Sequence, residues 1–372
     1  MLRRAAALAG VGLVAAGLAV ALISGGRLLG AHAGEPVAGL GRSAGTEAVP
    51  ATPAGSRATQ IARVDQGLVD IAASFRLAGA HGAATGMVIG PGGLVLTNNH
   101  VIDGASAVTA TSVVTGKTYT ATVLGYDRQA DVAVLRLEGA AGLPAVPLGH
   151  SSGLAVGAPV TALGNARGAG GTPRVARGVV TGLDSTILAG EAGGANVERL
   201  TGMIRTDARI VPGDSGGPLV DASGLVVGMS TASTAAAGPP QRVVTGFAVP
   251  IDTALAVAHR IVAGTGGAQV HIGPTAFIGV ALVPGPPASG AGSAAAGGPV
   301  VGGVVPGYPA AGIGLVRGDV IVSIGGHRIA SAATLADVVG RYRPGDVVLV
   351  VWKDLSGRLH SAPLTLAEGP PA

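Results

Sequence analysis

Residues 213–219 read Gly-Asp-Ser-Gly-Gly-Pro-Leu and are the most informative part of the sequence. A nucleophilic serine needs a tight turn that presents its hydroxyl, backbone N–H groups that face the developing oxyanion, and a base within hydrogen-bond reach. The glycines allow a sharp turn, so the N–H groups of Gly213 and Ser215 can point to one spot. Gly-Asp-Ser alone is a common loop tripeptide, but the seven residues together indicate a nucleophile at Ser215.

A candidate base lies upstream, in the stretch Thr-Asn-Asn-His-Val-Ile that begins at residue 97. It follows an apolar run that predicts a buried strand, which places His100 at the end of that strand. Further on, Asp131 comes just before an alternating strand, where its carboxylate can accept the imidazole Nδ1–H and stabilise the imidazolium. Asp103 and Asp127 are rivals, but Asp103 is close in sequence to His100 and Asp127 lies outside the strand.

The order His100, Asp131, Ser215 is that of chymotrypsin-like enzymes. With Asp-Val-Ala-Val-Leu at 131–135 and Gly-Phe-Ala-Val-Pro at 246–250, the chain resembles the HtrA (DegP-type) serine proteases over roughly residues 60–367. The resemblance implies a mainly β fold, with a chymotrypsin-like double β-barrel followed by one C-terminal PDZ domain. Family members mostly carry Asn before the serine, where this chain has Asp214.

Composition narrows the classes of function. Of 372 residues, 48% are hydrophobic but only 2% are aromatic, so the cores must be packed with Val, Leu, Ile and Ala. The chain has no cysteine, which excludes disulfides, a thiolate nucleophile and a cysteine-ligated metal. The net charge of +4 is scattered, and no basic cluster supports nucleic-acid binding. No metal or organic cofactor is implied.

The amino terminus, residues 1–30, is a targeting segment. Arg3 and Arg4 precede an uncharged apolar run at 5–26, long enough for a transmembrane helix with its positive flank in the cytoplasm. We favour an uncleaved, single-pass membrane anchor, although Ala31-His32-Ala33 offers a signal-peptide cleavage site that would release a secreted protein. Residues 31–60 then form a flexible linker.

The predicted protease domain covers residues 61–264. Apolar residues at helical spacing predict an entry helix from Ile61 to about Ala73, and Asp252 and Gly264 are typical of the two ends of a helix. Between the two predicted helices, short apolar runs broken by turn residues predict strands. These runs are 82–89, 94–96, 107–110, 118–126, 132–137, 159–163, 174–182, 217–220, 225–231 and 243–249.

The resemblance also implies the substrate pocket. Ile210 matches a position that is usually aliphatic, which implies cleavage after small or medium apolar side chains. Arg209 either reaches the pocket and favours an acidic residue or points outward to solvent. Gly228, Met229 and Ser230 would form the opposite wall.

The last predicted domain, residues 265–372, resembles a PDZ domain with a C-terminal tail. Its carboxylate-binding loop would be Phe277, Ile278, Gly279 and Val280, whose N–H groups capture the carboxylate of a C-terminal peptide. The stretch 307–321 is the more specific match, and the helical spacing at 334–339 supplies an apolar groove wall. The Pro/Gly/Ala-rich insert 284–299 is interpreted as a disordered loop.

These observations together predict a membrane-tethered, extracytoplasmic serine endopeptidase. Unfolded or damaged proteins would be its substrates, as in protein quality control, and the PDZ domain would regulate it or tether substrate. The alternative is a peptide-binding chaperone or scaffold with a latent protease domain. The resemblance also allows a homotrimer, with Phe75 among its contacts.

Overall fold

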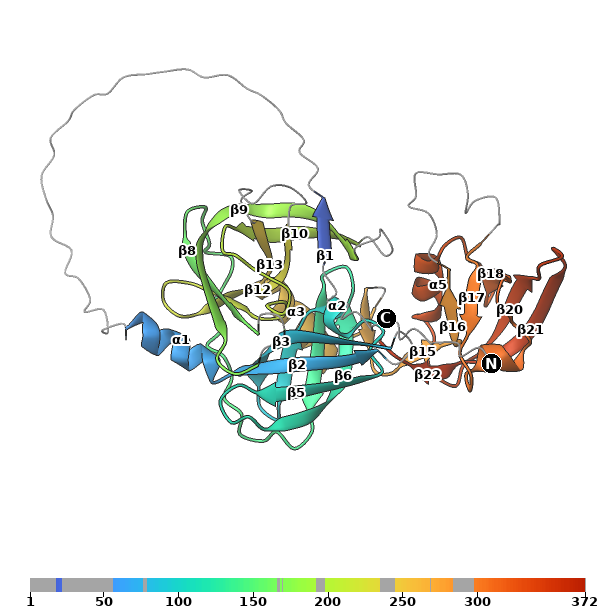
Figure 1. Cartoon of the computed structure of the whole chain (residues 1–372), viewed down its shortest axis with the longest axis horizontal. Coiled ribbons are helices and arrows are strands. Elements are labelled where there is room, and N and C mark those ends of the chain that lie inside the picture. The colour runs from blue at the N-terminus through green and yellow to red at the C-terminus, as the bar shows by residue number, and fades with distance from the viewer. Residues whose placement is uncertain are drawn as a thin grey trace, which may run out of the picture.

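The computed structural model describes residues 18–21, 56–75, 79–165, 168, 170–191, 198–234, 245–267, 269–283 and 298–371. Two β-barrels lie side by side, and a smaller β unit follows them in the chain (Figure 1). The mainly β architecture predicted from the sequence is confirmed. The first helix, α1 (Arg57–Asp65), precedes the barrels and is capped by the Ser56 hydroxyl, which accepts from the Thr59 N–H.

The first barrel closes because β7, at one end of its strand order, pairs with β6 near the other end. The strand order is β14-β6-β5-β2-β3-β4-β7, with the additional pairing β6–β7 completing the circle. Closure leaves no unpaired edge between these strands, which protects the barrel from edge-to-edge association. The strands are β2 (Leu68–Phe75), β3 (Ala80–Gly90), β4 (Leu94–Thr97), β5 (Ala107–Ser112), β6 (Thr118–Asp127), β7 (Val132–Leu137) and β14 (Val270–Ile272).

One sequence prediction fails here, because the predicted entry helix does not extend to Ala73. The helix ends at Asp65, and Leu68–Phe75 is strand β2. The spacing that suggests a helix is produced by a strand whose buried residues alternate imperfectly. β2 is held by β3 on one side and by the more distant β5 on the other, so pairing with its neighbours defines it as a strand although its own spacing does not.

The second barrel closes in the same way, through the pairing of β8 with β9. Its order is β9-β10-β13-β12-β11-β8, and β1 adds to the free edge of β9. The interior is filled by aliphatic side chains such as Val160, Ile204 and Leu219. The strands are β8 (Pro159–Gly164), β9 (Arg174–Glu191), β10 (Glu198–Thr206), β11 (Pro218–Val220), β12 (Val226–Thr234), β13 (Thr245–Pro250) and β1 (Leu18–Ala21).

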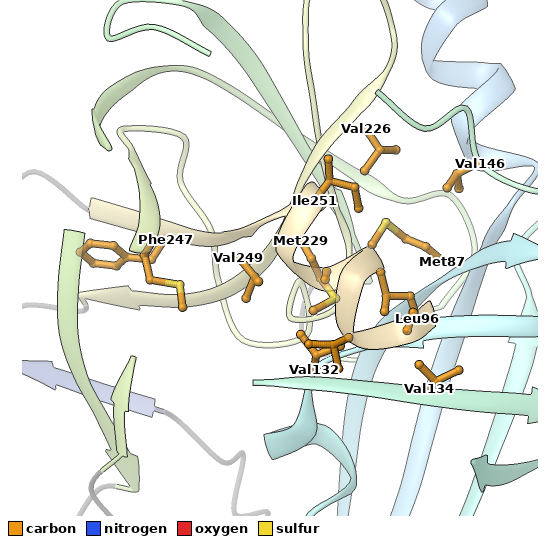
Figure 2. Close-up of a cluster of buried hydrophobic side chains, with 14 of the residues drawn as sticks. Met87, Leu96, Val132, Val134, Val146, Val226, Met229, Phe247, Val249 and Ile251 are labelled. Atoms are coloured by element: carbon orange, nitrogen blue, oxygen red, sulfur yellow. The ribbon is translucent and has the colours of Figure 1, made fainter. Parts of the chain in front are cut away.

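A shared apolar cluster joins the two barrels. It takes Met87 and Leu96 from the first barrel and Met229 and Val249 from the second (Figure 2). Ile251, at the start of helix α3 (Ile251–Val262), completes it (Figure 2). All five side chains are essentially inaccessible to water, and burying one such side chain contributes about 1.5–3 kcal/mol. The boundary between the barrels is therefore a rigid seam.

Helix α3 ends as predicted but begins differently. Gly264 follows the helix with φ +69°, in the left-handed region that favours glycine after a helix. The N-cap is Pro250 rather than Asp252, which lies in the first turn. The Asp252 carboxylate accepts hydrogen bonds from the Ser151 and Ser152 N–H groups, at 2.9 and 3.0 Å. It therefore ties the helix to a neighbouring loop instead of capping it.

The C-terminal unit has its own apolar core, which includes Ile321, Trp352 and Leu364. Leu335 and Val338 of its longer helix are buried in this core. Strand β14, which the sequence assigns to this domain, instead pairs with β6 of the first barrel. The elements of the unit are β15 (Thr275–Phe277), β16 (Val280–Leu282), β17 (Val301–Val304), α4 (Pro309–Gly312), β18 (Val320–Ile324), β19 (His327–Arg328), α5 (Ala332–Val339), β20 (Val347–Lys353), β21 (Leu359–Thr365) and β22 (Ala367–Gly369).

The predicted membrane anchor lies outside the described residues except at strand β1. Those four residues pair antiparallel with β9. In the described part of the chain, no helix has both the length and the apolar character that a membrane span requires. The predicted cleavage site at 31–33 and nearly all of the insert 284–299 also lie outside the described residues.

Candidate active site

His100 lies at the seam between the barrels, on the short helix α2 (Asn99–Ile102) that follows β4. Its Nδ1 is 3.0 Å from both carboxylate oxygens of Asp131, and its backbone N–H donates to Asp131 Oδ1 at 3.0 Å. The imidazole is about one quarter exposed, whereas Asp131 is buried. These contacts orient the ring so that Nε2 faces away from the carboxylate. The structure thus brings together two residues that lie 31 positions apart.

Asp131 adopts an unusual backbone conformation to reach the ring. Its φ is +52°, in the left-handed region that few residues other than glycine occupy. The Asn98 side-chain amide donates to the Asp131 carbonyl at 2.9 Å and holds this conformation. The rival Asp127 serves the preceding turn, where its Oδ1 accepts from the Ala130 N–H. The positive φ of Asp131 is a strained conformation of a kind that is frequent at functional sites.

Thr231, on β12, links this pair to Ser215. Its hydroxyl donates to Asp131 Oδ2, and its carbonyl accepts from the Ser215 hydroxyl at 3.1 Å. The side chain is buried. Sequence reasoning missed Thr231, because a threonine in an apolar strand carries no signal of its own. Only the pairing of β12 within the second barrel brings it to a residue 100 positions away.

The turn that carries Ser215 is fixed against strand β3 by Thr85. The Thr85 hydroxyl donates to the Gly213 carbonyl at 2.8 Å, and its N–H donates to the Ser215 carbonyl at 2.8 Å. Gly216, with φ +80°, lies so close that a Cβ there would be 2.1 Å from the Thr85 carbonyl oxygen. Thr85 was also missed, because its role depends on contact between β3 and a loop about 130 residues later.

The backbone N–H groups of this turn divide into two sets. Those of Asp214, Gly216 and Gly217 donate to carbonyls within the fold, at 2.8–3.0 Å. Among the described residues, the N–H groups of Gly213 and Ser215 donate to no acceptor. Two unused donors next to a serine hydroxyl are what an oxyanion-binding turn requires.

The predicted pocket residues lie in different surroundings. Ile210 is buried in the core of the second barrel, and Met229 is buried in the seam cluster. Gly228 and Ser230 flank Met229 on β12, where the Ser230 side chain is fully buried. Arg209 is exposed. Ile210 and Met229 thus support the site from within the protein.

In the C-terminal unit, the predicted carboxylate-binding loop connects β15 to β16. Gly279 has φ +87°, and a Cβ there would lie 2.1 Å from Tyr308 Cβ. The Tyr308 ring meets Phe277 edge to face, at 5.0 Å between centroids. Among the described residues, the N–H groups of Ile278 and Gly279 donate to no acceptor. β16, which begins at Val280, pairs with β17 on one edge and with no other described strand.

Comparison with known proteins gives relatives across most of the chain. "Serine protease PepD" of Mycobacterium tuberculosis is 32% identical over 376 residues, covering 97% of this chain and 75% of that protein. "Putative serine protease HhoA" of Synechocystis sp. is 37% identical over 273 residues, covering 69% of this chain and 64% of that protein. A "Probable periplasmic serine endoprotease DegP-like" of Chlamydia muridarum is 32% identical and covers 77% and 54%. The matched part of the chain thus spans between about half and three quarters of these relatives' lengths.

Two family models and one group of solved structures also match. Residues 84–229 match the trypsin-like peptidase domain, and residues 300–353 match the PDZ domain. The solved structure "HtrA-type protease AlgW with tripeptide" aligns with a TM-score of 0.48 at 28% identity, covering 85% of this chain and 98% of that one. With the two closed barrels, the family models define the class as trypsin-like serine peptidases that carry a C-terminal PDZ domain. The chain belongs to the HtrA/DegP family within that class, as its relatives show.

Proposed function

We propose that the chain is an extracytoplasmic serine endopeptidase that cleaves unfolded or damaged proteins through an acyl-enzyme. The observation that carries the proposal is the link through Thr231. Its hydroxyl binds Asp131, which orients His100, and its carbonyl accepts from the Ser215 hydroxyl. One residue thereby connects all three groups that a Ser-His-Asp mechanism requires.

In the proposed reaction, the Ser215 hydroxyl turns from the Thr231 carbonyl toward His100 Nε2 and passes its proton to that nitrogen. The serine oxygen attacks the scissile carbonyl carbon, and the N–H groups of Gly213 and Ser215 bind the resulting oxyanion. Asp131 stabilises the imidazolium, which then protonates the leaving amine. Water, deprotonated by His100, hydrolyses the acyl-enzyme.

Substrate class and location are inferred from the family. Several relatives are named periplasmic endoproteases, and the N-terminal pattern of Arg3 and Arg4 before an apolar run favours export. The C-terminal unit supports peptide binding, because PDZ domains add an extended peptide to a free strand edge. The β16 edge and the N–H groups of Ile278 and Gly279 are suited to a peptide that ends in a carboxylate.

The test is fluorophosphonate labelling combined with casein cleavage. We expect wild type to be labelled, and Ser215→Ala and His100→Ala each to lose turnover by about 10⁶-fold. The double variant should lose no more than either single variant, because the two residues act as one unit. Ser223→Ala, on an exposed turn, serves as the control that keeps full activity. Activity retained by Ser215→Ala would reject the mechanism, and wild type that never labels would favour the chaperone or scaffold alternative.

A further inference from the structure

A buried carboxylate lies between the two proposed oxyanion donors. Asp214 separates Gly213 from Ser215 and is only 1% exposed. Its Oδ2 accepts from the Val211 N–H and from Arg174 Nη1, both at 3.0 Å. Its Oδ1 is buried and has no hydrogen-bond partner among the described residues. Burial raises the pKa of this carboxyl, and the Arg174 charge opposes that effect. A buried carboxylate with so few donors is stable in its ionised form only when its cation, here Arg174, stays in place.

Arg174 holds the nucleophile loop at more than one point. It is the first residue of β9 and is about one third exposed. The Nη1 atom that contacts Asp214 also donates to the Arg209 carbonyl at 2.7 Å. One guanidinium nitrogen therefore binds both ends of the segment 209–214, which leads into the nucleophile.

The neighbouring backbone leaves this segment little room to move. A Cβ at Gly164, on the strand that pairs with the start of β9, would lie 2.6 Å from Asp214 Cα. The Asp214 N–H donates to the Val211 carbonyl at 3.0 Å and closes a turn. Gly164 of the β8–β9 hairpin thus packs against the backbone of the turn, and Arg174 holds the turn through hydrogen bonds.

The charge of Arg174 also affects the proposed oxyanion site, because it neutralises Asp214. An unpaired carboxylate beside the donors would repel the negative charge that develops on the substrate oxygen, and in a site with little water such repulsion is weakly screened. The Arg174 guanidinium neutralises Asp214 without occupying the Gly213 or Ser215 N–H groups. A neutral Asn at position 214 could still accept the Val211 N–H, because its amide oxygen is an acceptor.

We propose that Arg174 is the positioning residue of the oxyanion turn and that Arg174 and Asp214 form a matched pair. Removing the charge of Arg174 lowers the rate of catalysis unless the charge of Asp214 is removed as well. The proposal rests on the proposed endopeptidase function. In the free enzyme, the pair fixes the segment 209–214 so that both donors face one point. During reaction, it keeps the neighbouring carboxylate from opposing the oxyanion.

The experiment compares four variants by kcat, KM and labelling rate. Arg174→Gln should lower kcat by about 100-fold with KM changed less than about threefold, an effect comparable to loss of an oxyanion donor. Arg174→Lys keeps the charge and should lose less. Arg174→Gln combined with Asp214→Asn should recover to within about tenfold of wild type. Arg177→Gln, an exposed change of the same kind on the same strand, is the matched control.

The variant comparison separates positioning from mere folding. A kcat loss in Arg174→Gln no greater than in Arg177→Gln would overturn the proposal. It would also be overturned if the Asp214→Asn change failed to restore the double variant while the melting temperatures stayed equal. Wild type that does not label at all would instead contradict the proposed function.

A measurement that needs no activity completes the test. In ¹⁵N-serine-labelled protein, the Ser215 amide signal is identified by its loss in Ser215→Ala. We expect this signal to shift in Arg174→Gln and to return toward its wild-type position in the double variant. An unmoved signal would overturn the proposal whether or not the wild type is active.

Discussion

At the scale of single residues, the site depends on two threonines, each of which makes two hydrogen bonds to the proposed catalytic residues or to the turn that carries Ser215. Thr231 binds Asp131 and Ser215, and Thr85 binds both sides of the nucleophile turn. Local sequence indicated His100, Asp131 and Ser215, because those residues lie in distinctive motifs. It could not indicate the threonines, since their roles arise only where strands distant in sequence meet.

Removing the Thr231 hydroxyl should weaken catalysis without unfolding the protein. Thr231→Val keeps the side-chain shape but takes one donor from the buried Asp131 carboxylate. We expect kcat to fall about tenfold with KM nearly constant, and stability to fall by about 1 kcal/mol. Steady-state kinetics and thermal unfolding measure the two effects. Thr111→Val, which removes an exposed contact between the Thr111 hydroxyl of β5 and the Thr118 hydroxyl of β6, is the control and should change neither value.

Asp70 gives a prediction about pH and stability. Burial raises its pKa from 3.8 to about 6 in the folded protein. The folded chain therefore binds this proton more tightly than the unfolded chain, and the ionised form is destabilising above about pH 6. Asp70→Asn should stabilise the protein at pH 8 by on the order of 1 kcal/mol, because partial exposure screens the effect.

The Asp70→Asn advantage should shrink as the pH falls through 6 and should disappear near pH 3.8, the unfolded value. Thermal melts of both proteins across pH 4–8 measure it. A difference that is the same at every pH would show that the ionisation of Asp70 does not contribute to stability.

At the scale of elements, the sequence predicts the helices and strands that are defined by their own residues better than those defined by distant neighbours. Most strands of the two barrels and the end of α3 at Gly264 follow from local runs and turn residues, but β10 and β14 were not predicted. The region 66–75 did not follow from local runs either, because β2 is defined by its two neighbours rather than by its own spacing. The prediction that Asp252 caps α3 was wrong for a similar reason. Its carboxylate accepts from N–H groups of a loop 100 residues away in sequence rather than from its own helix.

The Asp252 tether should be worth measurable stability. Asp252→Ala removes the acceptor for the Ser151 and Ser152 N–H groups and a negative charge from the first turn of α3. We expect a loss of about 1–2 kcal/mol, because hydrogen bonds to a charged acceptor are lost but the freed N–H groups can bond to water. Denaturant unfolding measures it. His150→Ala removes only a largely exposed partner and should stay within about 0.5 kcal/mol of wild type.

At the scale of the whole molecule, the C-terminal unit contacts the first barrel at several points. The Tyr126 hydroxyl of β6 lies 3.2 Å from Thr275 Oγ1 of β15, and the Gly104 N–H donates to the Pro371 carbonyl at 2.7 Å. Gly104 follows the helix that carries His100. A cavity of about 1020 Å³ lies between the two units, lined by residues of both, which include Val123 and Tyr308. The units are joined through contacts that a bound ligand could shift.

A peptide bound to the C-terminal unit should therefore change the activity of the protease site. We expect a peptide with an apolar last residue to bind the N–H groups of Ile278 and Gly279 through its free carboxylate. Binding shifts activity only if the peptide prefers one arrangement of the protease loops over another. A coupling of about 1–3 kcal/mol corresponds to activation of roughly 5- to 150-fold.

Titrating such a peptide while casein cleavage and binding are both measured tests this coupling. The matched control is the same peptide with an amidated C-terminus, which lacks the charged carboxylate and should neither bind tightly nor activate. If the amidated peptide binds equally well, the assignment of residues 277–280 is wrong. Saturating binding with an unchanged cleavage rate would instead show that the C-terminal unit only tethers substrate. The two outcomes differ because the carboxylate contact is local to one loop, whereas activation requires the contacts between the units to transmit the change.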